Sequence, residues 1–119
     1  MFHIDRFSFG SIVIGGTKHI RDVILLPNGT VKGRAGGFWI VGSHSIKKEE
    51  VAELIDSGAG DIIIGVGVLS RARLSDEANA YTQSHDFELS IMPSRDAVKK
   101  YNQSIDEGQK AAALIHITC

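Results

Sequence analysis

Short apolar runs alternate with helical patterns in the second half of the chain, and this alternation constrains the fold more than any other feature. Apolar residues fill most of positions 61–67, 87–92 and 111–118, and the segments between them carry apolar residues at helical spacing. A strand that is apolar along its whole length is typical of the centre of a parallel sheet. Parallel neighbours need a long crossover, usually a helix, so the pattern predicts a βαβαβ unit over residues 61–118.

Three helices are expected, and each begins at a serine whose hydroxyl can accept a hydrogen bond from a free backbone N–H of the first turn. These caps are Ser45, Ser75 and Ser94. Each helix then places apolar side chains on one face: Val51, Leu54 and Ile55; Leu74, Ala78 and Tyr81; and Ala97, Val98, Tyr101 and Ile105. Glycine favours the left-handed conformation that ends many helices, so Gly58 and Gly108 mark two of the carboxyl ends.

The first half of the chain is rich in β-branched residues and glycine. Residues 11–14 and 20–26 have the composition of strands, and a Pro-Asn-Gly sequence at 27–29 separates the second from a further short run at 30–32. Asn-Gly tolerates positive φ at both positions, so it suits a tight reversal. We therefore predict an antiparallel β-ribbon. With the βαβαβ half it makes one domain, residues 1–119, of the α/β (α+β) class, with a mixed sheet flanked by helices.

The composition excludes several classes of protein. The chain has 119 residues, with 13 basic and 14 acidic side chains and a net charge of −1, which argues against a nucleic-acid surface because phosphate binding depends on clustered Lys and Arg. A single Cys excludes an internal disulfide framework and a multi-cysteine metal site. No apolar run approaches the ~20 residues that cross a bilayer, and the sequence starts without an apolar signal core. We expect a soluble, cytoplasmic domain that does not bind membranes.

Glycines at the end of the first apolar run raise the question of a nucleotide site. Gly65-Val66-Gly67 has the spacing that starts a dinucleotide fingerprint. However, Ser70 takes the place of the third glycine, and the next strand ends without a carboxylate. A sharp turn of the chain is therefore the preferred interpretation of these glycines.

A less specific ligand site stays open. In open α/β sheets, ligands bind beyond the carboxyl ends of the strands, where Gly65, Gly67, Ser70, Ser94 and Arg95 are expected, and the helix start at Ser94 favours an anion. Asn102 offers a donor and an acceptor and is added to the set, although a structural bond to a neighbouring loop is the preferred interpretation of its role. The predicted ligand-binding residues are thus Gly65, Gly67, Ser94 and Asn102.

No residue pattern points to catalysis or to a metal. The five histidines include no pair at i, i+4 spacing and no dense cluster with Cys, and His116 is expected in the core or at a sheet edge. His44 lies between two serines, but nothing in the pattern supplies an orienting acid. Cys119 stands last, whereas a catalytic thiol needs a base held by the surrounding fold. We therefore predict no catalytic residue, no metal and no cofactor.

Phe38 and Trp39 are the predicted interaction residues. They follow Gly36-Gly37, and aromatic residues in such surroundings can anchor a protein interface. Packing beneath the sheet is an equal alternative. The apolar run 38–41 is also compatible with a homodimer, the commonest oligomer.

Several short motifs follow one another in an order that is similar to that of a known family. They are FSFG at 7–10, DVILLPNG at 22–29, Trp39 with His44, DIIIGVG at 61–67, Ala97, Tyr101-Asn102, Gly108 and HITC at 116–119. This ordered set resembles the Mth-domain family, which includes adipogenesis-associated proteins and a mitochondrial respiratory complex I assembly factor. The resemblance implies a three-layer β/α fold with a central mixed sheet. For the mitochondrial members it implies binding to partner proteins without established catalysis.

Two functions follow from these observations. The first is a non-enzymatic protein-interaction domain, similar to an assembly factor, with an unidentified protein partner. The alternative is a small-ligand or cofactor-binding enzyme that uses the crevice at the carboxyl ends of the parallel strands. Stabilisation of the domain by an anion or a nucleotide would favour the second.

Overall fold

The computed structural model describes residues 2–34, 44–84 and 88–119. The strands in these ranges are β1 (Ile4–Ser8), β2 (Ser11–Ile14), β3 (Thr17–His19), β4 (Val23–Leu25), β5 (Val31–Gly33), β6 (Ser45–Ile46), β7 (Asp61–Gly65), β8 (Arg73–Leu74), β9 (Ser90–Met92) and β10 (Ala111–Ile115). The helices are α1 (Lys48–Asp56), α2 (Asp76–Ser84) and α3 (Ser94–Asp106).

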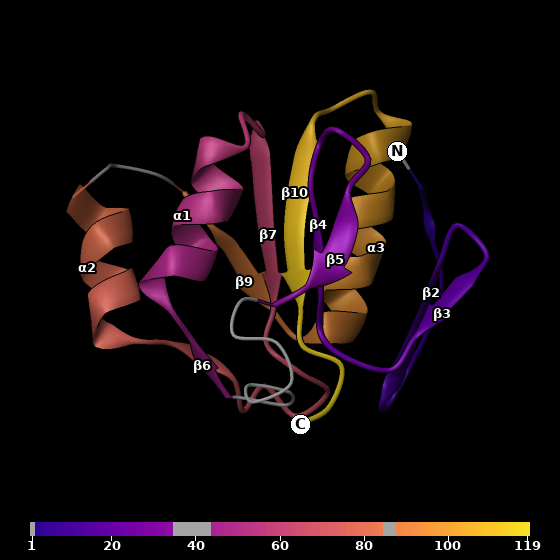
Figure 1. Cartoon of the computed structure of the whole chain (residues 1–119), viewed down its shortest axis with the longest axis horizontal. Coiled ribbons are helices and arrows are strands. Elements are labelled where there is room, and N and C mark those ends of the chain that lie inside the picture. Colours follow the sequence, from indigo (N-terminus) through magenta and orange to yellow (C-terminus); the bar gives the residue numbers. More distant parts are fainter. Residues whose placement is uncertain (1, 35–43, 85–87) are drawn as a thin grey trace.

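A five-stranded mixed sheet in the order β5-β4-β10-β7-β9 forms the centre of the domain (Figure 1). Strands β7, β9 and β10 are parallel to one another, β4 is antiparallel to β10, and β5 is antiparallel to β4. Helix α2 connects β7 to β9, and α3 connects β9 to β10. The predicted βαβαβ unit and mixed sheet are therefore confirmed.

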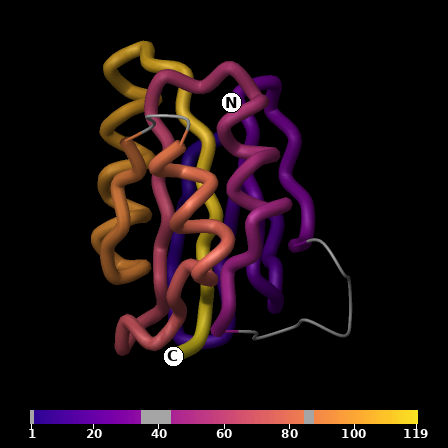
Figure 2. Tube along the Cα trace, turned by 90° about the vertical axis from the view of Figure 1, so that its left-hand side faces the viewer, coloured from indigo at the N-terminus to yellow at the C-terminus, as the bar shows by residue number. Residues whose placement is uncertain are grey.

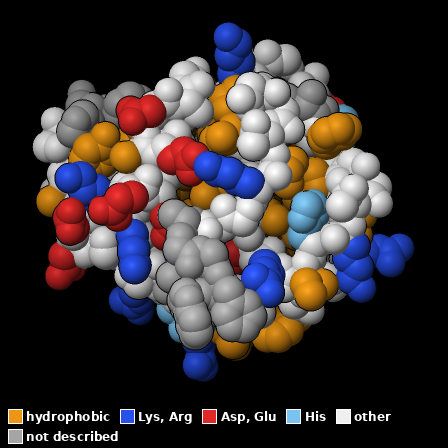
Figure 3. Space-filling model, in the orientation of Figure 1, with side chains coloured by type: hydrophobic (Ala, Val, Ile, Leu, Met, Phe, Trp, Pro, Cys, Tyr) orange, Lys and Arg blue, Asp and Glu red, His pale blue; other side chains and the backbone are white. Residues whose placement is uncertain are grey.

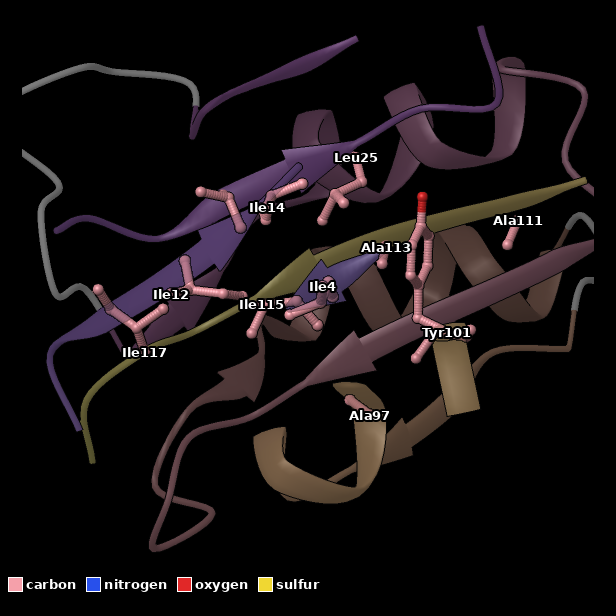
Figure 4. Close-up of a cluster of buried hydrophobic side chains, with 12 residues drawn as sticks. Ile4, Ile12, Ile14, Leu25, Ala97, Tyr101, Ala111, Ala113, Ile115 and Ile117 are labelled. Carbon is pink, nitrogen blue, oxygen red and sulfur yellow. The ribbon is translucent and has the colours of Figure 1, made fainter. Parts of the chain in front are cut away.

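Strand β10 is buried along its whole length, and both faces of the sheet are covered there. Because side chains alternate along a strand, Ala111, Ala113 and Ile115 face one core, and Ala112 and Leu114 face the other. Figure 4 shows the first core, where the ring of Tyr101 from α3 lies beside Ala111 and Ala113 of β10. Alanine at these positions leaves room for the helix to approach the sheet.

Three layers result from this double burial. Helices α1 and α2 cover one face of the central sheet, and their apolar residues share a core with Ile62 and Ile64 of β7. Helix α3 and a smaller sheet, β1-β2-β3, cover the other face and share a core with Ile63. Figure 2 shows α3 and α1 on opposite sides of the central strands. This is the three-layer arrangement that the family resemblance implies.

The first half does not form one ribbon, as the sequence predicted, but two separate antiparallel units. Strands β1, β2 and β3 make their own sheet, whereas β4 and β5 form a hairpin inside the central sheet. Burial explains the division: all three residues of β4 are buried, so this strand needs cover on both faces. In β2, buried Ile12 and Ile14 alternate with half-buried residues, so this strand packs mainly through one face.

The reversal between β4 and β5 is confirmed, but its geometry differs from the prediction. Among the described residues around it only Gly29 has positive φ, at +91°, and Asn28 does not. The Gly29 N–H donates to the Leu26 carbonyl at 3.0 Å, and the Leu26 N–H donates to the Thr30 carbonyl at 2.9 Å. Pro27 and Asn28 are therefore the central residues of the turn, and the φ near −65° that proline imposes is incompatible with a primed turn centred on them.

Two of the three predicted helix starts are wrong. Ser45 lies in β6, which pairs with β8, and α1 begins at Lys48, where the Glu50 carboxylate accepts the Lys47 N–H at 3.0 Å. Ser94 is the first helical residue of α3 rather than its cap. The cap of α2 is confirmed, because the Ser75 hydroxyl accepts the Ala78 N–H at 3.1 Å.

The glycine helix ends are confirmed as well. Gly58 and Gly108 have φ of +81° and +78° directly after α1 and α3. The strand predicted at 87–92 is shorter than expected, since β9 covers only Ser90–Met92.

Two glycine-to-alanine substitutions should change stability in opposite directions. Gly29→Ala forces a side chain into a left-handed conformation and should lower the free energy of unfolding by about 1 kcal/mol. Gly33→Ala, in a strand without positive φ and with open space at the Cβ position, should raise it by about 0.5 kcal/mol. Urea denaturation of both variants measures the two changes, and equal effects would contradict the turn geometry.

Candidate functional site

The carboxyl ends of β7, β9 and β10 meet at one end of the domain, the lower end in Figure 1. Two chain segments cover this end: the loop 66–72 after β7 and the segment 116–119 after β10. The Val68 N–H donates to the Thr118 carbonyl at 2.7 Å, and the N–H groups of Leu69 and Arg71 both donate to the Cys119 oxygen, at 3.2 and 3.0 Å. The position where ligands bind in many open α/β sheets is thus occupied by the chain itself.

Gly67 permits this close approach of the two segments. Its φ is +102°, and a Cβ atom built there would lie 2.2 Å from the carbonyl carbon of Cys119. A side chain at this position would therefore displace the segment 116–119. Gly65 has a similar role toward α3, because its Cβ would lie 2.8 Å from the Ser94 hydroxyl.

Ser94 joins the ends of the parallel strands through its buried hydroxyl. The Oγ atom accepts the Gly67 N–H at 2.8 Å and donates to the His116 carbonyl at 2.5 Å. The Ser94 N–H in turn donates to the Gly67 carbonyl at 3.1 Å. The structure thus brings Gly65, Gly67 and Ser94 together, and their polar groups named here are bound within the chain.

Asn102, the fourth residue of the predicted ligand set, does not join the other three. It lies two helical turns beyond Ser94, about 12 Å along the axis of α3. Its Oδ1 accepts the Ile4 N–H at 2.8 Å and its Nδ2 donates to the Ile4 carbonyl at 2.9 Å. This pair of bonds fixes β1 against α3, which agrees with the structural role preferred for Asn102.

A buried ionic cluster lies beside this end of the sheet and was not predicted from the sequence. Arg34, which follows β5, donates through Nε and Nη2 to both Glu50 oxygens at 2.6 and 2.9 Å. Its Nη1 donates to Asp22 Oδ2 at 2.9 Å, and its Nη2 also reaches the Ser45 carbonyl at 2.8 Å. All three charged side chains are at most 3% exposed. The cluster therefore links the start of β4, the end of β5 and α1.

His116 connects the cluster to the segment after β10. Its Nδ1 lies 2.7 Å from Asp22 Oδ2, and the Ile117 N–H donates to Asp22 Oδ1 at 2.9 Å. The ring is fully buried, which confirms that His116 belongs to the core, and the His44 ring meets it edge-on with centroids 5.2 Å apart. Asp22 thus binds Arg34, which follows β5, and the first two residues after β10.

Partners outweigh desolvation at both ends of the Asp22–Arg34 ion pair. Burial raises the pKa of Asp22, but the hydrogen bonds from His116, Ile117 and Arg34 lower it below its ordinary value of 3.8. Burial likewise lowers the pKa of Arg34, and Glu50 and Asp22 together raise it above its ordinary value. Both groups are therefore charged at neutral pH.

The series Asp22, His116 and Thr118 has the chemical order of a carboxylate, an imidazole and a hydroxyl. The Thr118 Oγ1 lies 3.2 Å from His116 Nε2, on the side opposite to Asp22. However, His116 has no exposed surface, and the nearby N–H groups of Leu69 and Arg71 already bind the Cys119 oxygen. A substrate carbonyl would reach these groups only after displacement of residues 118–119, so the arrangement does not point to catalysis.

Three large apolar side chains stand exposed around the same end: Phe9, Ile20 and Leu69, at 59%, 69% and 60% exposure. We call these three residues the apolar rim. Phe9 precedes Gly10, whose N–H donates to the Ile117 carbonyl at 2.8 Å, and Leu69 is bonded to Cys119. Ile20 lies two residues before Asp22, which binds the Ile117 N–H. Figure 3 shows orange side chains reaching the surface beside Lys and Arg at the lower end of the domain.

The remaining predictions concern the interaction residues, a metal site and membrane-spanning segments. Phe38 and Trp39 lie outside the described residues, so their predicted role in interaction stays a prediction. Within the described ranges, no group of three His, Cys, Asp or Glu side chains could hold a metal ion. In the same ranges, no helix has the length and apolar character that a bilayer crossing requires.

Comparisons with known proteins give a family and a fold. The family described as protein of unknown function (DUF498/DUF598) matches residues 4–116. The solved structure of MT938 is 26% identical, with a TM-score of 0.82 over 100% of both chains. A conserved hypothetical protein from Pyrococcus horikoshii OT3 is 23% identical, with a TM-score of 0.75 over 98% of both chains.

A further solved structure is described as a Mth938-like domain. The Mth938-like domain of Bordetella pertussis is 14% identical, with a TM-score of 0.58 over 96% of this chain and 84% of that chain. Together with the family match over residues 4–116 and the 26% identity to MT938, this confirms the predicted resemblance to the Mth-domain family.

Removal of the Ser94 hydroxyl should destabilise the junction of the parallel strands. Ser94→Ala leaves the Gly67 N–H and the His116 carbonyl buried without this partner, which should cost about 3 kcal/mol. Hydrogen exchange of the Gly67 amide should accelerate. The matched control Ser8→Ala, at an exposed position of β1, should stay within about 0.5 kcal/mol of the wild type in urea denaturation. An effect of Ser94→Ala as small as that of the control would contradict this role.

The ionic cluster should make stability depend on acid. Because the folded-state pKa of Asp22 is lowered, its contribution is complete above 3.8 and is lost as the pH falls through the folded value. Asp22→Asn should reduce the free energy of unfolding by about 3 kcal/mol at pH 7, and the difference from the wild type should shrink below pH 3.8. The exposed control Asp96→Asn should change it by less than about 0.5 kcal/mol at pH 7. A difference for Asp22→Asn that is independent of pH would contradict the assignment.

Proposed function

The chain belongs to the DUF498/DUF598 family, and from that premise we propose that it is a protein-interaction domain, similar in kind to an assembly factor. The observation that carries the proposal is the apolar rim, because Phe9, Ile20 and Leu69 are each more than half exposed at one end of the domain. We also propose a cytoplasmic location for the domain.

Exposed apolar side chains are common singly, but a group of them at one end of a domain indicates contact with another molecule. The rim residues come from three different turns, after β1, after β3 and after β7. Because these turns lie outside the core, packing does not require apolar side chains at these positions. Polar residues there would keep the fold, so the presence of Phe, Ile and Leu favours a role in binding.

The hydrogen bonding beneath the rim supports a protein partner over a small ligand. The N–H groups of Gly67, Val68, Leu69 and Arg71 all donate to acceptors within the chain. A small anion or a nucleotide phosphate would have to displace these acceptors, whereas a protein can bury the rim without breaking them. The alternative of a small-ligand enzyme at Gly65, Gly67, Ser94 and Asn102 stays a prediction.

Site-specific photo-crosslinking tests the proposal. A benzoylphenylalanine at position 9 or at position 69 should give a discrete adduct with another protein in living cells of the native host. The same probe at position 2, which is 56% exposed at the far end of the β1-β2 hairpin, should not give it. The adduct from position 9 should fall about tenfold when Leu69→Asp is also present.

A matched variant tests whether the adduct depends on the rim or on any exposed apolar side chain. Ile91→Asp changes a residue that is 48% exposed on edge strand β9 and should leave the adduct unchanged. Thermal melting establishes that both Asp variants are folded. A band at twice the mass of 12.9 kDa would identify the partner as a second copy of the chain. Equal crosslinking from positions 2, 9 and 69 would overturn the proposal.

A further inference from the structure

Exposed arginines surround the apolar rim. Arg71 follows Leu69 by two residues on the same loop, and Arg73 begins β8. Arg95 lies in the first turn of α3, with its guanidinium 5.4 Å from the Phe7 ring centroid. Arginine is enriched in protein interfaces because its fork pairs with carboxylates while its stem packs on apolar surface.

A groove beside the rim is also basic. It has a volume of about 300 Å³ and is lined by residues 18–23 and Gly33. Lys18, His19 and Arg21 belong to this lining. Its one carboxylate, Asp22, is buried and bound to Arg34 and His116, so it does not offer a negative charge to a ligand. The groove thus combines the apolar side chain of Ile20 with basic neighbours.

The opposite end of the domain has the opposite charge. Asp56 ends α1, Asp106 ends α3 and Glu107 follows it, and all three are exposed. Lys110 follows within the same end, and His3 contacts Asp106 at 2.5 Å. Exposed carboxylates thus gather at the end away from the rim, whereas Arg71, Arg73 and Arg95 lie at the end that carries it.

Some acidic side chains do lie near the basic end. Asp76 and Glu77 begin α2, and Asp96 lies in the first turn of α3. Glu77 lies 3.9 Å from Lys48, so it is paired in part. These carboxylates flank the rim rather than interrupt the Leu69 to Arg73 stretch, which contains no acidic residue.

We infer that the apolar rim docks a segment of a partner protein in which acidic and apolar side chains alternate. This inference rests on the proposed function and names the partner's chemistry. Apolar side chains of the segment would cover Phe9, Ile20 and Leu69, and its carboxylates would pair with Arg71, Arg73 and the basic groove. Charge complementarity of this kind accelerates encounter and selects among partners.

A protein segment fits this surface better than an anionic membrane does. A flat array of lipid phosphates would approach Asp76, Glu77 and Asp96 together with the arginines, whereas a peptide can place its charges to avoid them. The groove beside Ile20 has a volume of about 300 Å³, which gives room for a side chain of the partner, as is common in protein recognition.

Selection from a random dodecapeptide library, displayed on phage and panned on the immobilised full chain at low salt, tests the inference. Enriched peptides should be net acidic with interspersed apolar residues, and their affinity should fall as salt is added. Arg71→Glu with Arg73→Glu should weaken them about tenfold. Lys99→Glu with Lys110→Glu makes the same change in net charge on exposed residues away from the rim and should weaken them less than twofold.

The outcomes separate the two proposals. Peptides that bind the wild type and Leu69→Asp equally would overturn the proposed function together with this inference. Peptides that lose binding to Leu69→Asp but are neutral or basic would overturn this inference alone. Co-sedimentation with mixed phosphatidylcholine and phosphatidylserine vesicles, reduced by the Arg71/Arg73 reversal, in the absence of enriched acidic peptides would assign the surface to lipid instead.

Discussion

Four buried ionisable side chains hold one end of this domain together. Asp22, Arg34, Glu50 and His116 come from four separate stretches of the chain, and each is at most 6% exposed. An isolated charge buried in this way would be strongly unfavourable, so each member depends on the others remaining in place. The hairpin β4–β5, helix α1 and the segment after β10 are therefore positioned together rather than independently.

This mutual dependence explains why the end of the sheet presents a surface instead of an open crevice. Asp22 binds the Ile117 N–H, which positions the segment 116–119 across the carboxyl ends of the parallel strands. The loop after β7 then donates the N–H groups of Val68, Leu69 and Arg71 to that segment. The backbone N–H groups of residues 67–72 are thus satisfied within the chain, and the side chains of Phe9, Ile20 and Leu69 face outward. Binding by contact over a surface is what such an end offers.

The sequence was sufficient for features that depend on local pattern. The unbroken apolar runs predicted β7 and β10 in the centre of the sheet, and Ser75, Gly58 and Gly108 marked helix ends correctly, because each acts on neighbouring residues. The prediction that Ser94 caps α3 is wrong because its hydroxyl has non-local partners, the Gly67 N–H and the His116 carbonyl.

The ionic cluster was beyond prediction for the same reason. Arg34 and Glu50 are 16 residues apart, and Asp22 and His116 are 94 apart. Charged residues at such separations carry no periodic signal in a single sequence. Asp22 is a carboxylate beside the buried run of β4, which is unusual locally, but the sequence does not indicate which residues it contacts.

The difference between core and turn positions also determines what a shared fold says about the binding surface. The fold depends on buried positions, above all the small and apolar residues of β10 and the residues that pack on them. The apolar rim and the arginines around it lie on turns, loops and helix starts, where substitution leaves the core intact. Two chains can therefore share this fold at low identity and present different surfaces at this end. It follows that a partner has to be sought from the exposed side chains of each chain and not from the fold.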